Sequence, residues 1–380
     1  MKLHIDAHML RDALATVRPA IATRSTLPVL QCVLIDGDGV IQATNLDTHI
    51  ATRLGTKSEG DDGGAIAVPG SLLIDLVAQM PPGQITLEMV ERTKLRIVGH
   101  GAKAHLSGIN ASEFPLRAES DGDRLRMDSD KLREGIDRVI YAAAKGESRP
   151  ILTGVHIFVK NKIMELACSD GYRLAQAWMG VDLPGEVDMV VPATGVAAIR
   201  RILPMERSVV VTVDPRRSHL TVEDNGTIAS IRTIEGNFPN VSSIIPTEFE
   251  TTVGIENHEL TQAIRRAEIV ARGGQTRRGA FSLWPRSAQH MVILEVAEGA
   301  VVVSGEGEEG SSRSEIPANV EGEGVRFALD ARHALDALGA LPGNEAQLRL
   351  NGRFKPVEIR APGADCMGLI MPMTEKQGDA

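Results

Sequence analysis

Aromatic side chains are scarce in this chain and make up only 3% of its 380 residues. Proteins that hold single-stranded nucleic acid without reading its sequence stack the bases on aromatic rings, so the scarcity argues against that mode of binding. Cysteine is also scarce, because Cys32, Cys168 and Cys366 are the only three and lie far apart, each in an apolar stretch. We therefore expect buried free thiols in a reducing compartment.

Long apolar runs are missing as well. The first residues, MKLHIDAHML, contain no hydrophobic segment of signal-peptide length, and no later run is long enough to cross a bilayer. The content of 43% hydrophobic and 24% charged residues is that of an ordinary soluble protein, and 380 residues suffice for two or three domains. The sequence predicts a cytoplasmic protein without membrane contact.

Residue patterns for catalysis or metal binding are absent from the sequence. GEGEEG at 305–310 has dinucleotide-loop spacing, but a strand follows it and its glutamates would repel phosphate, so we interpret it as an acidic hairpin loop. DGDG at 36–39 and HELTQ at 258–262 lack the residues that complete a calcium loop or a zinc-protease helix. We predict no catalytic residue, metal or cofactor. An enzyme on this scaffold would need ionisable residues gathered in one cleft.

The chain does contain a unit that occurs three times. Apolar residues recur at helical spacing in 8–24, 130–149 and 258–278, and strand-like runs around a turn follow each segment. A second helix, predicted at 70–80, 193–203 and 330–341, stops at a proline in every copy. Two more strands follow, and the copies close at Phe114-Pro115, Phe238-Pro239 and Met371-Pro372-Met373.

The repeat predicts an α+β fold of three domains, 1–122, 123–248 and 249–380, each with two helices on antiparallel sheets. Asp130 is expected to cap the first helix of the second copy.

Positive charge is concentrated in the predicted helices. The first helices of the copies carry +2, +1 and +3 and the second helices −1, +2 and −1, a total of +6. Because the net charge of the chain is −9, the remainder carries −15. Such a distribution suits a surface that attracts a polyanion in one place, and duplex backbone contact fits it best. Solvated Lys and Arg on ordinary helix faces would give the same pattern.

Two further segments differ from their counterparts in the other copies. SDGYRLA at 169–175 is a turn followed by a strand, and Gly-Tyr-Arg is peculiar to the second copy. GLIMPM at 368–373 places flexible Met beside rigid Pro, which suits adaptable peptide binding. A last edge strand with a buried Met explains the second segment equally well.

Taken in order, TLPVL (26–30), SEFP (112–115), SDGYRLA, GNFP (236–239) and the final MPM resemble the bacterial DNA sliding clamp, the β subunit of DNA polymerase III. The resemblance covers essentially the whole chain. It implies a head-to-tail homodimer whose six domains close into a ring, with helices lining a hole for duplex DNA. It also implies a non-catalytic processivity factor, to which the polymerase III α subunit, the clamp loader, other DNA polymerases and repair proteins bind through short peptides.

The resemblance implies a peptide pocket between the second and third copies. The second copy and the connector after it would supply Leu152, Ser169, Gly171, Tyr172, Arg173, Leu174, Pro239 and Ile244. The third copy would supply His333, Phe354, Pro356, Leu369, Ile370, Met371, Pro372 and Met373. Peptide sites of this kind are apolar clefts with a few polar groups that orient the ligand.

The resemblance also implies DNA and dimer contacts. Arg24 in TRSTLP and Arg149 match its DNA-binding positions, and helix position adds Arg200, Arg201, Arg265, Arg266 and Arg272. Leu106 of one subunit would meet Ile269 and Val270 of the other.

Several positions depart from the family pattern. Ser243 stands where many relatives have Arg, His333 where many have Tyr, and Tyr172 replaces a common His. Arg277 falls where an aromatic is frequent, and TEKQGDA extends the tail beyond Met373. These departures leave open a paralogue with altered clients, such as a phage-borne or drug-resistant second clamp.

Overall fold

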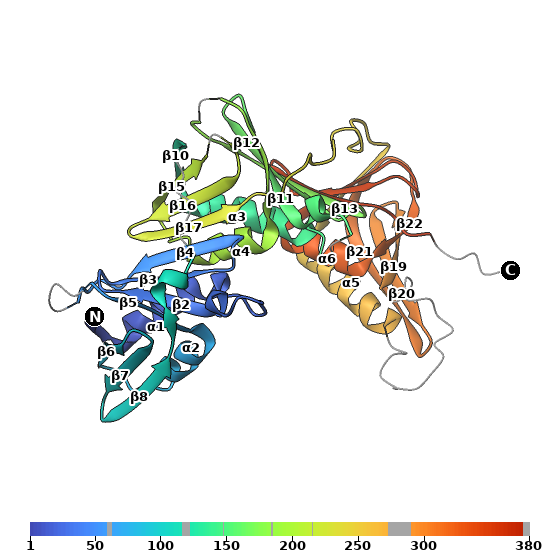
Figure 1. Cartoon of the computed structure of the whole chain (residues 1–380). Coiled ribbons are helices and arrows are strands. Elements are labelled where there is room, and N and C mark those ends of the chain that lie inside the picture. The colour runs from blue at the N-terminus through green and yellow to red at the C-terminus, as the bar shows by residue number, and fades with distance from the viewer. Residues whose placement is uncertain are drawn as a thin grey trace. The chain divides into compact units, whose positions relative to one another are not determined.

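The computed structural model describes residues 1–58, 63–115, 122–146, 148–183, 185–214, 216–272 and 290–374 (Figure 1). Its contacts group the chain into two compact units. Unit 1 consists of Met1–Arg133 and Val181–Glu235, and unit 2 of Glu134–Gly180 and Gly236–Ala380. The second repeat is thus shared between the units, and the domain boundaries at 122 and 248 stay a prediction.

Antiparallel strands from the first two repeats form unit 1. The smaller sheet has the order β1 (Lys2–Asp6), β6 (Gln84–Glu91), β7 (Lys94–Gly99) and β8 (Ala102–Ser107). The larger sheet runs β10 (Asp123–Asp128), β15 (Ser208–Val213), β16 (His219–Asp224), β17 (Thr227–Arg232), β4 (Thr48–Arg53), β3 (Val40–Thr44), β2 (Cys32–Asp36), β5 (Ala65–Pro69) and β9 (Ile109–Asn110). Ile228 of β17 pairs with Ala51 of β4, so the two repeats share one hydrogen-bonded sheet. Val190 of β14 (Val187–Pro192) forms a bridge with Ile234.

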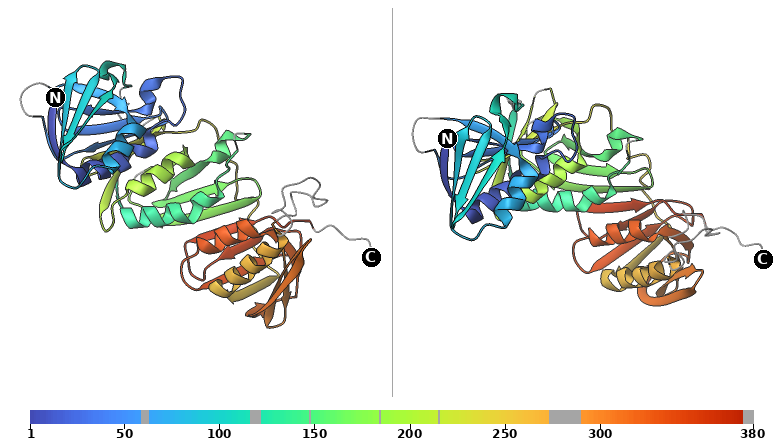
Figure 2. Two further views of the ribbon diagram at one scale, coloured as in Figure 1. Left: turned by 90° about the horizontal axis from the view of Figure 1, so that it is seen from below. Right: turned by 60° about the horizontal axis from the view of Figure 1, so that its bottom comes forward.

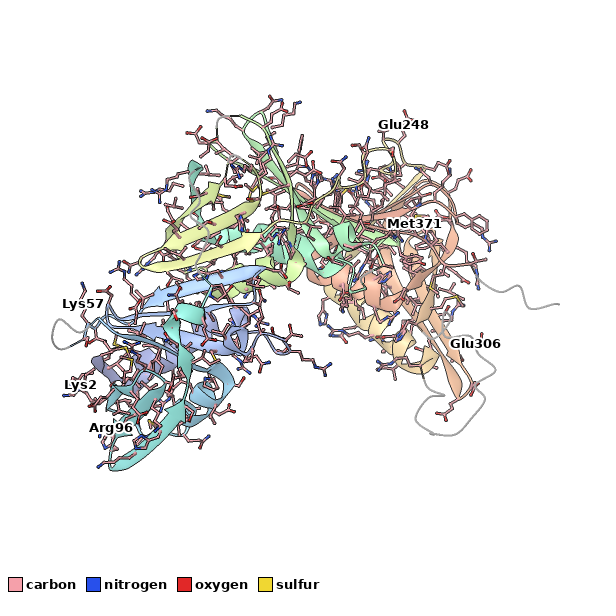
Figure 3. All side chains as sticks on the ribbon, viewed as in Figure 1. Lys2, Lys57, Arg96, Glu248, Glu306 and Met371 are labelled. Atoms are coloured by element: carbon pink, nitrogen blue, oxygen red, sulfur yellow. The ribbon has the colours of Figure 1, made fainter. Side chains whose placement is uncertain are left out.

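Strands from the last two repeats are joined in the same way in unit 2. Their order is β11 (Gly154–Lys160), β12 (Ile163–Ser169), β13 (Arg173–Gly180), β25 (Cys366–Ile370), β24 (Val357–Arg360), β23 (Glu345–Leu350), β18 (Thr251–Glu256), β21 (Gly310–Glu321), β20 (Ala300–Gly307), β19 (Met291–Ala297) and β22 (Arg326–Asp330). Arg173 of β13 pairs with Ile370 of β25. The ladder of β20 and β21 ends with Gly307 opposite Gly310, so the predicted acidic hairpin is confirmed; Figure 3 marks Glu306 near its tip.

All six predicted helices are present, with ends that differ from the prediction. They are α1 (Ala7–Val17), α2 (Gly70–Ala78), α3 (Ser129–Val139), α4 (Ala193–Ile202), α5 (Asn257–Ala271) and α6 (Ala331–Gly339). The prediction that the first helix reaches residue 24 is wrong, because Pro19 has no amide hydrogen for the helical pattern and the chain passes into a 3-10 turn at Arg18–Ala20. The first helix of the second repeat, α3, also passes into a 3-10 turn, at Ile140–Ala142, so its predicted end at residue 149 is wrong as well. The predicted end of the third, at 278, lies outside the described residues.

The N-cap prediction for α3 is also wrong by two residues. Oδ1 of Asp128 accepts hydrogen bonds from the backbone N–H groups of Asp130 (2.9 Å) and Lys131 (3.2 Å). Asp128 therefore caps this helix. Asp130 instead accepts, through Oδ2, a hydrogen bond from the backbone N–H of Glu206 at 2.9 Å.

In each repeat, a side chain from the first helix satisfies carbonyl groups at the end of the second. Arg11 of α1 donates to the carbonyls of Val77 (3.1 Å) and Met80 after α2. Arg133, the fifth residue of α3 as Arg11 is of α1, donates to the carbonyl of Leu203.

The third repeat reaches the same result with other residues. Thr261 holds the fifth position in α5 and donates to Asn257 (3.2 Å), whose amide Nδ2 donates to the carbonyl of Leu338 (3.1 Å). Because the last carbonyls of a helix lack intrahelical partners, these contacts stabilise the helix ends.

The observed helix ends change the charge argument. With these bounds, α1, α3, α5 and α6 are neutral, α2 carries −1 and α4 carries +2, a total of +1. The helices therefore carry less positive charge than predicted, although they remain basic relative to the rest of the chain, which carries −10. The shorter bounds leave Arg18, Arg24, Lys145, Arg149 and Arg272 outside the helices, in the segments that follow the first helix of each repeat.

The helices cover one face of their sheets. In unit 2, α5 and α6 lie side by side against the strands of the third repeat (Figure 2). Leu260 and Ile264 of α5 and Leu338 of α6 are buried there with Phe327 of β22. Full burial of each such side chain stabilises a fold by roughly 1.5–3 kcal/mol.

Candidate functional site

A cavity of about 550 Å³ lies in unit 2. Residues from the end of β12, the following turn, β13 and β25 form one part of its lining: Ser169, Gly171, Tyr172, Arg173, Leu174, Leu369 and Met371. The connector before β18 and the loop between β23 and β24 form the other: Ser243, Ile244, Ile245, Pro246, Asn351, Lys355 and Pro356. Most of these side chains are apolar, as in sites that bind peptides or small molecules.

Hydrogen bonds within the turn between β12 and β13 fix a conformation that leaves Tyr172 exposed. Oδ1 of Asp170 accepts hydrogen bonds from the backbone N–H groups of Tyr172 (2.9 Å) and Arg173 (3.1 Å), and Oγ of Ser169 accepts one from Gly171 (3.1 Å). Gly171 has φ of +91°, where a side chain is strained, and a Cβ there would lie 2.9 Å from Nη2 of Arg149. Tyr172 consequently stands 67% exposed at the rim.

Beneath the turn, Arg173 is a buried anchor. Its guanidinium donates to Oδ2 of Asp170 (3.0 Å), to Oδ2 of Asp336 in α6 (2.7 Å) and to the carbonyl of Tyr141 (2.6 Å). It also lies 5.4 Å from the centre of the Tyr141 ring. With two carboxylates paired to it, Arg173 adds little net charge to the cavity and holds the turn against the helical layer.

The apolar floor comes from packing across the second and third repeats. Leu174 and Leu369 are paired neighbours on β13 and β25 and are buried together with Val241. Met371, marked in Figure 3, follows β25, is 44% exposed, and its N–H donates to the carbonyl of Tyr172 at 2.9 Å. The alternative of a last edge strand with a buried Met is wrong, because β25 pairs with β13 on one side and β24 on the other and Met371 is accessible. The segment supplies both a buried Leu and an accessible Met.

The cavity brings together about half of the predicted pocket residues. Ser169, Gly171, Tyr172, Arg173, Leu174, Ile244, Pro356, Leu369 and Met371 line it. Leu152 and Ile370 are buried in the fold, Pro239 is exposed and Phe354 is 62% exposed. Met373 pairs with Ala328 of β22, two residues beyond the lining Met371, and Pro372 lies between them. These six, together with His333, lie outside the lining.

His333 stands behind the turn instead of facing the cavity. Its Nε2 is 4.0 Å from Oδ2 of Asp170. Burial, and then the nearby Arg173 guanidinium, lower the pKa of His333, so that the neutral imidazole is favoured.

Four lining residues were not predicted: Ile245, Pro246, Asn351 and Lys355. Ile245 and Pro246 follow the predicted Ile244 directly, and Lys355 precedes Pro356, so sequence neighbourhood could have indicated them. Ser243 was noted only as a departure from the family. Nothing in the sequence indicates Asn351, because its role depends on how the connector meets β23.

The residues predicted to contact DNA lie mostly on exposed segments. Arg24 is exposed between two 3-10 turns, Arg265 and Arg266 are exposed on α5, and Arg272 is its C-cap. Arg200 and Arg201 form the last turn of α4. Arg149 is also exposed and approaches Gly171, so it is next to the cavity turn as well.

The residues predicted for the dimer seam differ in exposure. Ile269 on α5 is 62% exposed and Val270 is half-buried, whereas Leu106 in β8 is buried within unit 1. β8 is the last strand in the order of its sheet. Arg277 and the tail from residue 375 onward lie outside the described residues.

The described part of the chain offers no other chemistry that we can identify. It contains no group of three or more His, Cys, Asp or Glu side chains arranged to hold a metal ion. Cys32, Cys168 and Cys366 are buried free thiols, as expected, and burial raises the pKa of each. Among these residues, no helix is long and apolar enough to span a membrane.

Comparison with known proteins places the whole chain. Models of the DNA polymerase III beta subunit match it in three consecutive pieces: the N-terminal domain at residues 1–118, the central domain at 126–240 and the C-terminal domain at 242–374. The beta sliding clamps of Synechococcus elongatus and Bacillus subtilis are 28% and 27% identical to it, each over 98% of this chain and 99% of theirs. The crystal structure of the DNA polymerase sliding clamp from Bacillus subtilis superposes with a TM-score of 0.88 at 25% identity and covers 99% of both chains. The chain therefore belongs to the DNA polymerase III beta subunit family, with all three of its domains.

Proposed function

We propose that this protein is a replicative sliding clamp, a non-catalytic processivity factor that encircles duplex DNA as a head-to-tail homodimer. The observation that carries the proposal is the cavity of unit 2, where nine residues implied by the resemblance surround one space. Its role is to bind short peptides of the replicative polymerase, the clamp loader and repair proteins. Apolar anchors would enter beside Leu174, Leu369 and Met371, while the Tyr172 hydroxyl at the rim is free to orient the ligand.

Ring closure is the second part of the proposal. Unit 1 ends its smaller sheet in β8, and strand edges of this kind pair readily with another chain. The exposed Ile269 on α5 supplies apolar surface that a partner subunit would cover. A heterologous contact of this kind closes into a ring when its rotation allows it.

DNA retention follows from the ring and needs no base-specific contact. Arg24, Arg149, Arg200, Arg201, Arg265, Arg266 and Arg272 are the proposed phosphate contacts. Arg24 and Arg149 both lie in the segment that follows the first helix of a repeat. Contacts with phosphate are independent of sequence and weaken with salt, as sliding requires.

The proposal is tested by titrating the chain into a fluorescent peptide of the Gln-Leu-x-Leu-Phe type and following its polarisation. Saturable binding at micromolar or lower concentration is expected. Met371→Ala combined with Pro372→Ala should weaken it by about 1–3 kcal/mol while the dimer persists, because Met371 lines the cavity and Pro372 follows it directly. A folded dimer that binds no peptide would refute the proposal for the cavity.

The paralogue with altered clients is not favoured by the comparisons. It would be revived if the chain formed a dimer but bound client peptides with a markedly different order of affinities.

A further inference from the structure

One wall of the cavity belongs to the connector and not to a strand. Ser243, Ile244, Ile245 and Pro246 line the cavity from this segment. On one side of the wall, Val241 is buried in the same cluster as Leu174 and Leu369. On the other side, the chain enters β18 at Thr251. The position of the wall therefore depends on what holds the chain just before β18.

The side chain of Asn351 holds that point with both ends of its carboxamide. Nδ2 donates a hydrogen bond to the carbonyl of Glu248 (2.6 Å), and Oδ1 accepts one from the N–H of Glu250 (2.8 Å). Asp could supply only acceptors and Leu neither group, so the arrangement requires an amide at this position. The residue before it, Leu350, accepts a further hydrogen bond from the Glu250 N–H at 3.1 Å.

Phe249, which lies between Glu248 and Glu250 in the chain, is held in place as well. The guanidinium carbon of Arg349 lies 3.8 Å from the centre of the Phe249 ring, at the distance of a cation–π contact. Arg349 donates in turn to Oε1 of Glu358 (2.9 Å), a carboxylate only 2% exposed, which Arg360 approaches to 3.6 Å. Phe249 thus packs on an ion network of β23 and β24 that has the buried Glu358 carboxylate at its centre.

Asn351 also lines the cavity itself, beside Lys355 and Pro356. Asn351 therefore holds the connector and also borders the space that a peptide would fill. Phe249, by contrast, is not among the cavity-lining residues. Asn351 and Phe249 hold the same part of the connector, but only Asn351 borders the cavity. Comparing variants of the two residues therefore separates a direct contact with the ligand from an indirect effect on its affinity.

We propose that Asn351 is a positioning residue of the peptide pocket: by clipping Glu248 and Glu250, it places the connector wall and thereby sets ligand affinity. The inference rests on the proposed function of the cavity. It predicts that breaking the clip weakens peptide binding even when the residue changed touches no ligand.

The test uses the full-length protein with Asn351→Ala, Phe249→Ala and the control Lys355→Ala, which changes a lining residue outside the clip. Hydrogen exchange of the Glu250 amide reports on the clip, and polarisation of the Gln-Leu-x-Leu-Phe peptide reports on the pocket. Exchange should be faster in Asn351→Ala and Phe249→Ala, with affinity about three- to tenfold weaker in both, the equivalent of one lost hydrogen bond. The variant with both substitutions should lose less binding free energy than the sum of the two single losses, because both substitutions disrupt the same attachment of the connector. Lys355→Ala should leave exchange unchanged.

Two results would overturn the inference while leaving the pocket in place. Equal affinity in wild type, Asn351→Ala and Phe249→Ala would show that the clip does not set binding. Weaker affinity of Asn351→Ala alone, with unchanged exchange at Glu250, would show a direct ligand contact. A wild-type protein that binds no peptide would instead overturn the proposed function, and this inference with it. Thermal melting of each variant, unchanged to within a few degrees, excludes unfolding as the cause.

Discussion

Nη1 of Arg173 lies 2.7 Å from Oδ2 of Asp336, so that the turn below the cavity rim is tied directly to helix α6. The Arg173 side chain is 7% exposed and that of Asp336 is 47% exposed. The pair links the lining of the cavity to helix α6. It also predicts how a change on a helix reaches the pocket.

Asp336→Asn should weaken peptide binding without contacting the peptide. The amide keeps an acceptor but not the charge, so the buried guanidinium loses part of its compensation, at a cost of about 1–2 kcal/mol in stability. Polarisation of the labelled peptide and urea unfolding measure the two effects. Asp75 holds the same sixth position in α2 that Asp336 holds in α6, and it is exposed. Asp75→Asn is therefore the matched control, and an equal loss of affinity in both variants would contradict the prediction.

Gly171→Ala should reduce the binding free energy of the peptide by more than it reduces the free energy of unfolding. The new Cβ meets Nη2 of Arg149 at 2.9 Å, and a side chain at φ of +91° adds strain of about 1 kcal/mol, so the turn that carries Tyr172 must shift. Gly363 has φ of +71° with open space around its Cβ position. Gly363→Ala should share the strain but leave affinity unchanged. We would compare both variants by peptide titration, and unaltered binding by Gly171→Ala would show that the turn is not part of the pocket.

Arg11→Ala should destabilise the protein by about 1–2 kcal/mol, because the carbonyls of Val77 and Met80 lose their charged donor. The free energy of unfolding in urea gives the measurement. Arg92, exposed between β6 and β7, provides the control variant Arg92→Ala, for which less than about 0.5 kcal/mol is expected. Similar losses in the two variants would mean that the helix-end contacts contribute nothing.

Stability should fall as pH drops below the ordinary pKa of histidine, in part through His333. Burial and the Arg173 guanidinium lower its pKa in the folded protein, so below the unfolded pKa of about 6.5 the unfolded chain binds more protons than the folded one. The contribution is present above this pKa and is lost as pH falls toward the folded value. His333→Gln should therefore flatten the dependence of the urea midpoint on pH as the pH falls below about 6.5. A slope identical to that of wild type would contradict the lowered pKa.

The repeat was readable from the sequence because helical spacing, turns and terminal prolines recur in the same order. The element order depends on local patterns of this kind, and the six helices and the acidic hairpin followed from them. The ends of α1 and α3 were misjudged because apolar spacing continues into 3-10 turns, where the side chains still pack but the hydrogen bonds change. Because of this error, the predicted first helix included the charges of Arg18 and Arg24, although α1 ends at Val17.

Long-range relationships could not be read in the same way. The pairing of β17 with β4 and of β13 with β25 joins neighbouring repeats. No local feature of these strands indicates which strand each one pairs with. Arg11 and Arg133 looked like solvated basic residues, and their carbonyl partners are 66 to 70 residues away in the chain. Asn351 was missed for the same reason, because its partners Glu248 and Glu250 lie about a hundred residues before it.

The most direct test of the sliding clamp is retention on DNA of different topology. The protein would be loaded with a clamp loader and ATP onto a nicked circular plasmid, isolated by gel filtration with the DNA, and then treated with an enzyme that cuts the plasmid once. If the dimer encircles the duplex, it stays with the circle and is released after linearisation, since phosphate contacts alone are weak at physiological salt. Protein that stays bound to the linear DNA would contradict a topological hold.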